Sequence, residues 1–352
     1  TAKAVDAWIA KLDGFGTGID GAIEKIRADA AIGCTPPRAL IVKTIPILDA
    51  FLTGKPGQQP IIGALKTRTA AAGLSVRMRE VAARRAITAL QRRVRPAINK
   101  LRSELLAMLP DARTDAGVWA LPDGAAFYAA NVQTLGDTGL SPDEVHQIGL
   151  DEVARISAEM NALLANRGMT QGSIGARMLA LAKYPANQFA DTDAGREALL
   201  DYVRAKVKGA ETRYADLLPA SLIPRQSLLV KRVPVATQAS APGGYYDGPS
   251  LDGTRPGTYW INLRDMTAVA KLRLPTLSYH EGVPGHHTQG SIAAALGAVP
   301  TLIKIASFNA YAEGWALYAE RLMAELGTYR DDPLGDLGRL QDELFRAVRL
   351  VV

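Results

Sequence analysis

Apolar residues recur at helical spacing through most of the first 220 residues. The segments with this period are separated by short stretches that contain glycine or proline, a pattern typical of helices joined by tight connections. Ser141 and Glu144 form the Ser-x-x-Glu signal of a helix N-terminus. Pro96 is expected to kink or interrupt a long basic helix. The predicted helices span residues 4–30, 37–53, 75–109, 123–135, 141–167, 173–183 and 194–217.

The pattern changes between residues 226 and 265, where short β-type runs alternate with glycine-rich stretches. Helical periodicity resumes near Met266, continues through a group of histidines, and returns over residues 300–326 and after Pro333. We therefore predict a mainly α fold with a small antiparallel β-sheet beside the helix that carries the histidines. The predicted strands cover residues 228–230, 233–235 and 258–263, and the predicted turns cover 243–246 and 252–253.

The domain organisation predicted from this pattern is one catalytic domain over residues 1–352. A helical body over 1–220 precedes the sheet and the metal-site helices over 221–352. The last residues, 350–352, are apolar and lack a helix terminator, so we expect the natural polypeptide to extend beyond one or both ends.

Composition excludes several classes of protein. The chain is 48% hydrophobic and 22% charged, which is typical of a globular protein, and its net charge of +6 comes largely from arginines between residues 77 and 102. Apolar residues at helical spacing in that segment predict that the arginines form a solvated face, and no aromatic residues accompany them to stack on bases, so we expect no nucleic-acid partner. No apolar run approaches the roughly 20 residues of a membrane span. Cys34 is the only cysteine, which excludes an intrachain disulfide.

Three of the four histidines fall within residues 280–287, with the sequence His-Glu-Gly-Val-Pro-Gly-His-His. Imidazoles are zinc ligands, and a glutamate beside a bound zinc can act on its water. The segment therefore predicts a site for one Zn²⁺ ion, with Glu281 as the general base. His146 has no comparable partner nearby and is expected to be a structural or surface residue.

The spacing of these histidines does not fit the usual zinc motif, in which two histidines lie four residues apart on one helix. Position 284 is proline. On an unbroken helix His286 would lie ~240° around the axis from His280, and His287 would lie ~10 Å further along it. Pro284 lacks the N–H that an interior helical turn needs, and the flanking glycines allow unusual backbone angles, so we expect a bulge that brings a later histidine back to His280. Spacing alone leaves His286 and His287 as alternatives.

A third ligand should come from another element, because a catalytic zinc has three protein ligands and an open position. Glu313 and Glu320 are the candidates on the next helix. Glu313 lies among apolar and aromatic residues in the sequence, where an unpaired carboxylate is costly, whereas Glu320 precedes Arg321 and could be a surface charge. We predict Glu313.

At these residues the chain resembles the bacterial proteins grouped as domain of unknown function 885, whose hallmark is H-E-x-x-P-G-H-H. The resemblance extends to Gly-Trp-Ala-Leu-Tyr-Ala-Glu at 314–320, to Asp-Gly-Thr-Arg-Pro-Gly at 252–257, and to Leu-Pro-Asp-Gly at 121–124 with the segment 144–149. That family is similar to helical zinc metallopeptidases of the thimet oligopeptidase and thermostable carboxypeptidase kind. The resemblance implies a zincin-like helical body with a deep cleft, and a location in the periplasm or cell envelope in preference to the cytoplasm.

The resemblance also implies roles for individual residues. His280 and His286 would be ligands, Glu313 the third ligand and Glu281 the base. His287 would orient the site or contact substrate. Family members usually extend further at both ends and carry an additional Asp and His after the position of Val352.

These features predict a zinc metallopeptidase, an oligopeptidase or carboxypeptidase whose partner is a short peptide. Glu281 would take the proton of the attacking water and pass it to the leaving amine. A strand such as 259–263 could hold an extended peptide by edge pairing or could serve only core packing. Two alternatives are a metal-dependent amide or ester hydrolase of a small molecule and a non-catalytic metal-binding module with four protein ligands. Candidate oxyanion donors or substrate contacts are Tyr245, Tyr246, Arg255, Tyr259, Tyr311 and Arg349.

Overall fold

In the computed structural model, which describes residues 2–297, 299–305 and 308–352, the chain is mainly helical, as predicted. It divides into two compact units, residues 1–128 and 129–352. The change of sequence pattern near residue 220 lies within the second unit. Across the described ranges, no helix is both long enough and apolar enough to cross a membrane.

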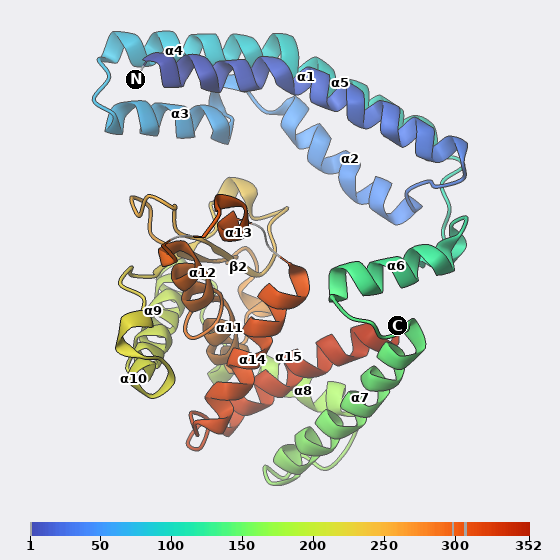
Figure 1. The fold of residues 1–352 in the computed structure, drawn as a ribbon, viewed down its shortest axis with the longest axis vertical. Helices are drawn as coiled ribbons and strands as arrows, with labels where there is room; N and C mark the ends of the chain where they lie inside the picture. The colour runs from blue at the N-terminus through green and yellow to red at the C-terminus, as the bar shows by residue number, and fades with distance from the viewer. Residues whose placement is uncertain (1, 298, 306–307) are drawn as a thin grey trace. The chain divides into compact units, whose positions relative to one another are not determined.

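The first unit consists of helices with their own apolar core. Buried Ile9 and Leu12 of the first helix pack with Ile62, Leu65 and Leu90 from later ones. One of these helices, over residues 60–71, was not predicted, because its Pro60 and Gly63 are typical of a connection. The helices are α1 (Ala2–Ala31), α2 (Arg38–Thr53), α3 (Pro60–Ala71), α4 (Val76–Ala89) and α5 (Arg95–Met108), and α6 (Gly124–Gly136) spans the boundary between the units (Figure 1).

Pro96 interrupts the basic helix, as predicted. A π-helical turn, η2 (Leu90–Val94), separates α4 from α5, and Pro96 is the second residue of α5, directly after that turn. Leu90 and Val94 of this turn point into the core, while Arg92 and Arg93 lie exposed. The arginines therefore form a solvated face.

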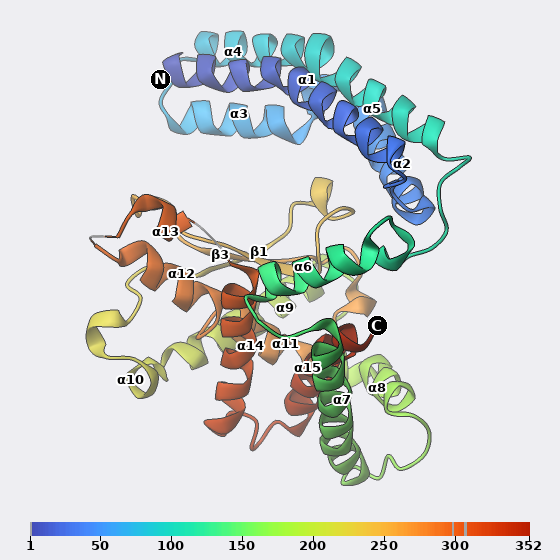
Figure 2. The same cartoon turned by 45° about the vertical axis from the view of Figure 1, so that its right-hand side comes forward.

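The second unit contains most of the remaining helices and the sheet. Its longest helix, α7, begins at a capping box in which Ser141 and Glu144 bond reciprocally, as the sequence predicted. α7 runs beside the last helix, α15 (Figures 1 and 2). The helices are α7 (Pro142–Ala165), α8 (Ile174–Lys183), α9 (Asp193–Glu211), α10 (Tyr214–Leu217), α11 (Leu274–Glu281), α12 (His286–Ala295), α13 (Thr301–Ile305), α14 (Asn309–Glu325) and α15 (Pro333–Val351). The helix predicted over 300–326 includes residues 306–307, which lie outside the described residues.

The sheet has three strands in the order β1 (Leu229–Arg232), β3 (Thr258–Ile261), β2 (Gly244–Asp247). β2 is antiparallel to β3, but β1 is parallel to it, so the prediction of an antiparallel sheet was wrong and the sheet is mixed. The double glycine at 243–244 suggested a turn, yet residues 244–247 form β2. Residues 233–235 are not a strand, because Pro234 has no N–H to pair and a short 3₁₀ turn follows it.

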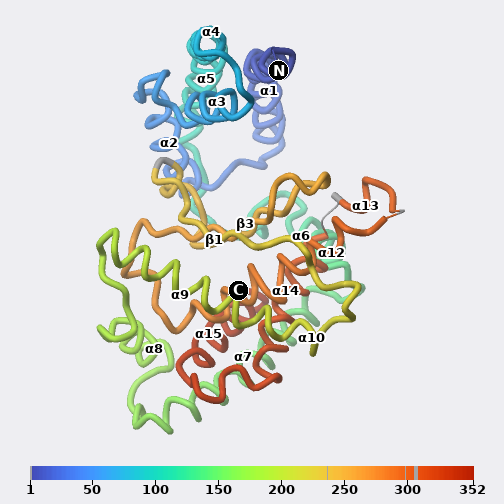
Figure 3. Tube along the Cα trace, turned by 90° about the vertical axis from the view of Figure 1, so that its left-hand side faces the viewer, coloured from blue at the N-terminus to red at the C-terminus, as the bar shows by residue number. Residues whose placement is uncertain are grey.

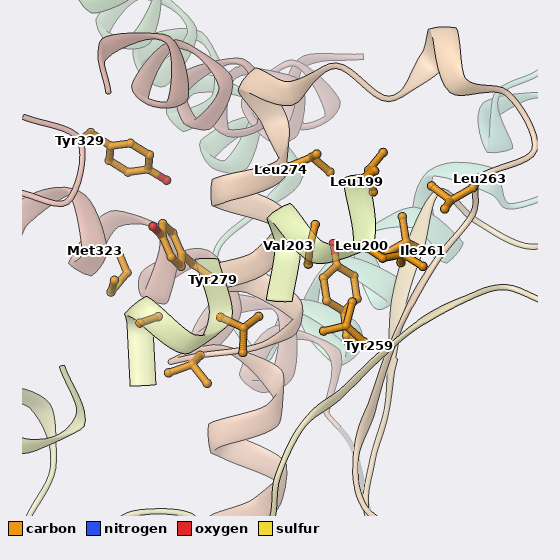
Figure 4. Close-up of a cluster of buried hydrophobic side chains, with 14 of the residues drawn as sticks. Leu199, Leu200, Val203, Tyr259, Ile261, Leu263, Leu274, Tyr279, Met323 and Tyr329 are labelled. Atoms are coloured by element: carbon orange, nitrogen blue, oxygen red, sulfur yellow. The ribbon is translucent and has the colours of Figure 1, made fainter. Parts of the chain in front are cut away.

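One face of the sheet packs on α9 and α11 and holds the helix of the first histidine in place. Figure 4 shows Tyr259 and Ile261 of β3 beside Leu199, Leu200 and Val203 of α9. The chain trace shows α9 running along the sheet below β1 and β3 (Figure 3). Because α11 also packs on α14 and α15, its last turn is enclosed by several elements.

Candidate metal centre

The segment between the histidines is broken, as its proline and glycines predicted. α11 ends at Glu281, and α12 begins at His286. The Val283–Pro284 peptide bond between them is cis. Gly285 N donates to the Tyr279 carbonyl at 2.9 Å, which folds the chain back over the end of α11. A Cβ at Gly285 would lie 2.0 Å from the His280 carbonyl oxygen, so only glycine fits this close approach.

This turn brings the rings of His280 and His286 together, with their centroids 4.8 Å apart and their planes nearly perpendicular. The carboxylate of Glu313, in the first turns of α14, lies between them. Its Oε2 is 3.4 Å from His280 Nε2, and its Oε1 is 3.7 Å from His286 Nε2. We call these three residues the donor group.

The donor group fits a divalent ion. One ligand atom from each residue lies within 4.8 Å of the others, and within the described ranges no other cluster of three such side chains is so close. Donors of a tetrahedral zinc with bonds of about 2.1 Å lie roughly 3.4 Å apart. Small shifts of these side chains would therefore bring all three donor atoms within bonding distance of one ion. Two imidazoles and one carboxylate are a common ligand set of catalytic zinc.

Glu320 does not lie on the surface, contrary to the expectation drawn from its neighbour Arg321. It is 2% exposed, and its Oε1 lies 2.8 Å from His280 Nδ1. The Oε1 atom also lies 3.1 Å from Arg346 Nη2 of α15, and Oε2 accepts a hydrogen bond from the Thr276 hydroxyl. Glu313, predicted on the basis of an apolar setting, is instead half exposed.

Thr276 and Arg346 were not identified from the sequence. Thr276 lies four residues before His280 and so on the same face of α11, a signal that was available. Glu320 is likewise seven residues after Glu313 and shares its face. No local pattern connects Arg346 with the histidines, because it follows them by some sixty residues.

The side chains around the donor group have displaced pKa values. Burial alone would lower the pKa of His280, but its contacts with Glu313 and Glu320 outweigh burial and raise it to about 9. Burial lowers the pKa of His286 to about 4, helped by the neighbouring charge of His280. The bond to His280 lowers the pKa of Glu313.

Glu281 is 6% exposed, and among the described residues none forms a hydrogen bond with its carboxylate. Burial raises its pKa to about 7, and the charges of Glu313 and Glu320 add to the effect, while His280 opposes it. A carboxyl group with this pKa can take up and release a proton near neutral pH.

His287 points away from the donor group. It is 1% exposed. Its Nε2 donates to the Gln226 carbonyl at 3.1 Å, which leaves Nδ1 to accept from the Tyr246 hydroxyl at 3.1 Å. The substrate contact predicted for His287 is therefore not accessible, and the Tyr246 hydroxyl, predicted as a catalytic donor, is turned toward His287. The Tyr246 ring lies nearly parallel to that of His286, with centroids 6.4 Å apart.

Tyr259 is fully buried in the core and cannot contact a substrate, contrary to prediction. It lies on the central strand, whose two edges are both paired, so β3 cannot accept a peptide by edge pairing either.

The remaining candidates lie on partly or fully exposed surfaces, and none forms a hydrogen bond or ion pair with the donor group. Tyr245 stacks on Trp260, with centroids 6.4 Å apart. Arg255 pairs with Asp247 at 3.1 Å. The side chain of Tyr311 is exposed, and the guanidinium of Arg349 lies over the Phe345 ring. His146 is exposed on α7, as expected of a residue outside the site.

A family model described as bacterial protein of unknown function, DUF885, matches residues 1–352. A crystal structure described as a "putative lipoprotein" from Colwellia psychrerythraea is 41% identical, with a TM-score of 0.94, and the match covers 100% of this chain and 60% of that one. A "putative lipoprotein of unknown function" from Shewanella oneidensis is 17% identical, with a TM-score of 0.59 over 99% of this chain and 61% of its own, and shares the fold. The chain thus spans less than two thirds of either protein. No curated protein matches it.

Proposed function

This chain belongs to the bacterial protein family DUF885, and we propose that it is a zinc-dependent hydrolase, a metallopeptidase that cleaves short peptides. The observation that carries the proposal is the convergence of His280, His286 and Glu313 from three helices beside the buried carboxyl group of Glu281. The H-E-x-x-P-G-H-H sequence then acts as a zinc-binding motif, with a turn in place of the continuous helix of the usual motif.

A metal held by these three residues alone would leave a coordination position for water, which favours catalysis over a structural metal site. A four-ligand site would need His287 or Glu320. Both ring nitrogens of His287 are engaged by Gln226 and Tyr246, and both carboxylate oxygens of Glu320 already accept hydrogen bonds. The non-catalytic alternative therefore has no fourth ligand among these residues.

Zinc held by the donor group would supply a Lewis acid and lower the pKa of a coordinated water toward about 7. Glu281 would take a proton from the attacking water and pass it to the leaving amine. The carboxyl group of Glu281 is buried and lies close enough to His280 and Glu313 for their charges to affect it, which supports this role.

A substrate could be held along β2. The sequence had suggested β3 for this role. β2 is an edge strand, and Gly244 at its start lies against Leu277 of α11, one turn before His280. An extended peptide could pair with this free edge through main-chain hydrogen bonds. Such pairing favours peptides over small amides or esters and fits an oligopeptidase or carboxypeptidase.

The 41% identical structure from Colwellia psychrerythraea is described as a "putative lipoprotein", which supports a location in the cell envelope. Short peptides there would be the accessible substrates. This location agrees with the one implied by the family resemblance.

Digestion of a peptide library by the zinc-loaded protein, followed by mass spectrometry, tests the proposal. We expect cleavage that a chelator abolishes, that zinc restores, and that Glu281→Gln lacks. Metal-dependent hydrolysis of small esters or amides with intact peptides would replace the peptidase assignment by the small-molecule alternative. Failure of the protein to bind any divalent ion would refute both.

A further inference from the structure

Glu320 occupies a position behind His280, on the side opposite the carboxylate of Glu313. We propose that Glu320, itself held by Thr276 and Arg346, is a positioning residue that fixes the orientation and the protonated nitrogen of His280, so that Nε2 is the atom presented to a divalent ion. This inference rests on the proposed metal site. It assigns to Thr276 of α11, Glu320 of α14 and Arg346 of α15 a part in metal binding that the three ligands alone do not provide.

The contacts around Glu320 use both of its oxygen atoms. Oε1 lies 2.8 Å from His280 Nδ1 and 3.1 Å from Arg346 Nη2. Oε2 accepts the hydroxyl hydrogen of Thr276, which is fully buried one helical turn before His280. A carboxylate held by three donors from two other helices cannot rotate without breaking at least one bond, so it provides a fixed acceptor for the imidazole.

The identity of these donors determines which imidazole nitrogen is free. Arg346 can only donate, so its contact of 3.2 Å with His280 Nδ1 cannot itself be a hydrogen bond when Nδ1 carries a proton. Both groups instead donate to the same Glu320 oxygen. Because the Glu320 carboxylate can only accept, the contact of 2.8 Å places a hydrogen on Nδ1, and the lone pair that the neutral ring offers a metal is on Nε2, which faces Glu313.

Burial explains why Arg346 is needed. Glu320 is 2% exposed, and a carboxylate at such a place is unfavourable unless a cation and hydrogen bonds compensate. Arg346 supplies the charge, and its Nη1 donates to the Asp342 carbonyl at 3.0 Å, which holds the guanidinium on α15. Glu313, by contrast, has a half-exposed side chain that can adjust to an ion.

The decisive measurement is zinc affinity of the full chain, determined by competition with a chromophoric chelator. Glu320→Gln keeps the shape but replaces one acceptor oxygen by an N–H donor facing Thr276 or Arg346. We expect the zinc Kd to rise roughly 10- to 100-fold. Thr276→Val removes one donor with little change of volume and should raise the Kd by roughly two- to tenfold.

Glu325→Gln is the matched control. Glu325 lies on the same helix as Glu320, but its side chain is 58% exposed and, among the described residues, forms an ion pair with Arg321 alone. We expect its zinc Kd to equal that of the parent protein. A second readout separates positioning from structural support: in the zinc-loaded protein the Nδ1 proton of His280 should give a strongly downfield ¹H NMR signal that moves upfield in Thr276→Val and Glu320→Gln.

The outcomes distinguish this inference from the proposed function. Wild-type protein that binds no divalent ion overturns the metal site itself. Wild-type binding together with Kd values for Glu320→Gln and Thr276→Val that equal the Glu325→Gln value overturns the positioning role and leaves the hydrolase proposal intact. Should Glu320→Gln fail to fold, the affinity and the Nδ1 signal of Thr276→Val decide.

Discussion

Trp315 Nε1 donates a hydrogen bond of 2.9 Å to the carbonyl oxygen of Pro284. This bond ties α14, which carries Glu313, to the turn that carries the chain from His280 to His286. The backbone of the turn joins His280 to His286, and the Trp315 side chain joins this turn to the helix of Glu313.

Trp315→Phe should loosen this link while keeping an aromatic ring. We expect the free energy of unfolding to fall by about 1 kcal/mol, the net value of one hydrogen bond. The zinc Kd should rise several-fold, because Glu313 and the histidines lose a shared anchor. Urea unfolding and chelator competition measure the two effects. A variant with lower stability but unchanged zinc affinity would show that the bond serves the fold alone.

Gly285→Ala should disrupt the turn. The added methyl group would lie 2.0 Å from the His280 carbonyl oxygen and 2.3 Å from that of Tyr279, so the backbone must move. We expect the free energy of unfolding to fall by about 2 kcal/mol or more, as for other overpacked sites. Gly209→Ala is the control, because nothing lies within 4 Å of a Cβ added at this position and alanine favours a helix. Thermal unfolding compares the two variants, and equal melting temperatures would contradict the close approach.

Glu281→Gln should separate metal binding from catalysis. The amide cannot accept the proton of the attacking water, so peptide cleavage should fall by roughly 10²- to 10⁴-fold. Zinc content should remain at one ion per chain, because Glu281 is not in the donor group. Metal analysis and cleavage assays on the same preparation test both statements. Unchanged turnover would reject Glu281 as the base.

His286→Gln should lower zinc affinity, whereas His287→Gln should lower the free energy of unfolding. The first removes a proposed ligand, so zinc affinity should fall by at least about 100-fold, with little change in the stability of the metal-free protein. The second removes a buried ring with two hydrogen bonds, so the free energy of unfolding should fall by about 1–3 kcal/mol. Zinc titration and urea unfolding of both variants distinguish the roles. Loss of zinc only in His287→Gln would exchange the two assignments.

Asp252 should make the stability of the loop between β2 and β3 depend on pH in the acidic range. Its Oδ1 accepts hydrogen bonds from the Ser250 hydroxyl and from the amide and hydroxyl of Thr254, and these bonds lower its pKa from 3.8 to about 2. Because the folded-state pKa is below the unfolded-state value, the contribution is fully present above pH ~4 and is lost as the pH falls toward ~2.

Asp252→Asn should therefore weaken the dependence of stability on pH between about 4 and 2 and leave the slope above this range unchanged. Urea unfolding at several pH values measures this difference. Identical slopes for both proteins over the acidic range would contradict the assignment.

Local patterns predicted the elements that depend on local forces. The capping box at Ser141 and the interruption at Pro96 follow from the hydrogen-bonding capacity of one or two residues. β2 could not be found in this way, because Gly244 favours a strand only when β3 lies beside it. The direction of β1 likewise depends on which strand occupies the centre of the sheet.

The site followed the same rule. The break at Pro284 and the return of an imidazole to His280 could be predicted from one short segment. Glu320 was misjudged because its neighbour Arg321 was taken as a guide, although adjacent residues on a helix point about 100° apart. Arg346 is brought to His280 only by the packing of α15 on α11, which no local spacing encodes.

The two imidazoles of the donor group belong to separate helices, so the gap between their nitrogen atoms is not set by the pitch of either one. It is set by residues 282–285, whose course depends on a glycine that admits no side chain. At the proposed metal site, the ionic radius that the pair tolerates would then depend on four residues outside the donor group, and exchanging that loop would be the most direct way to change the metal preference of this chain.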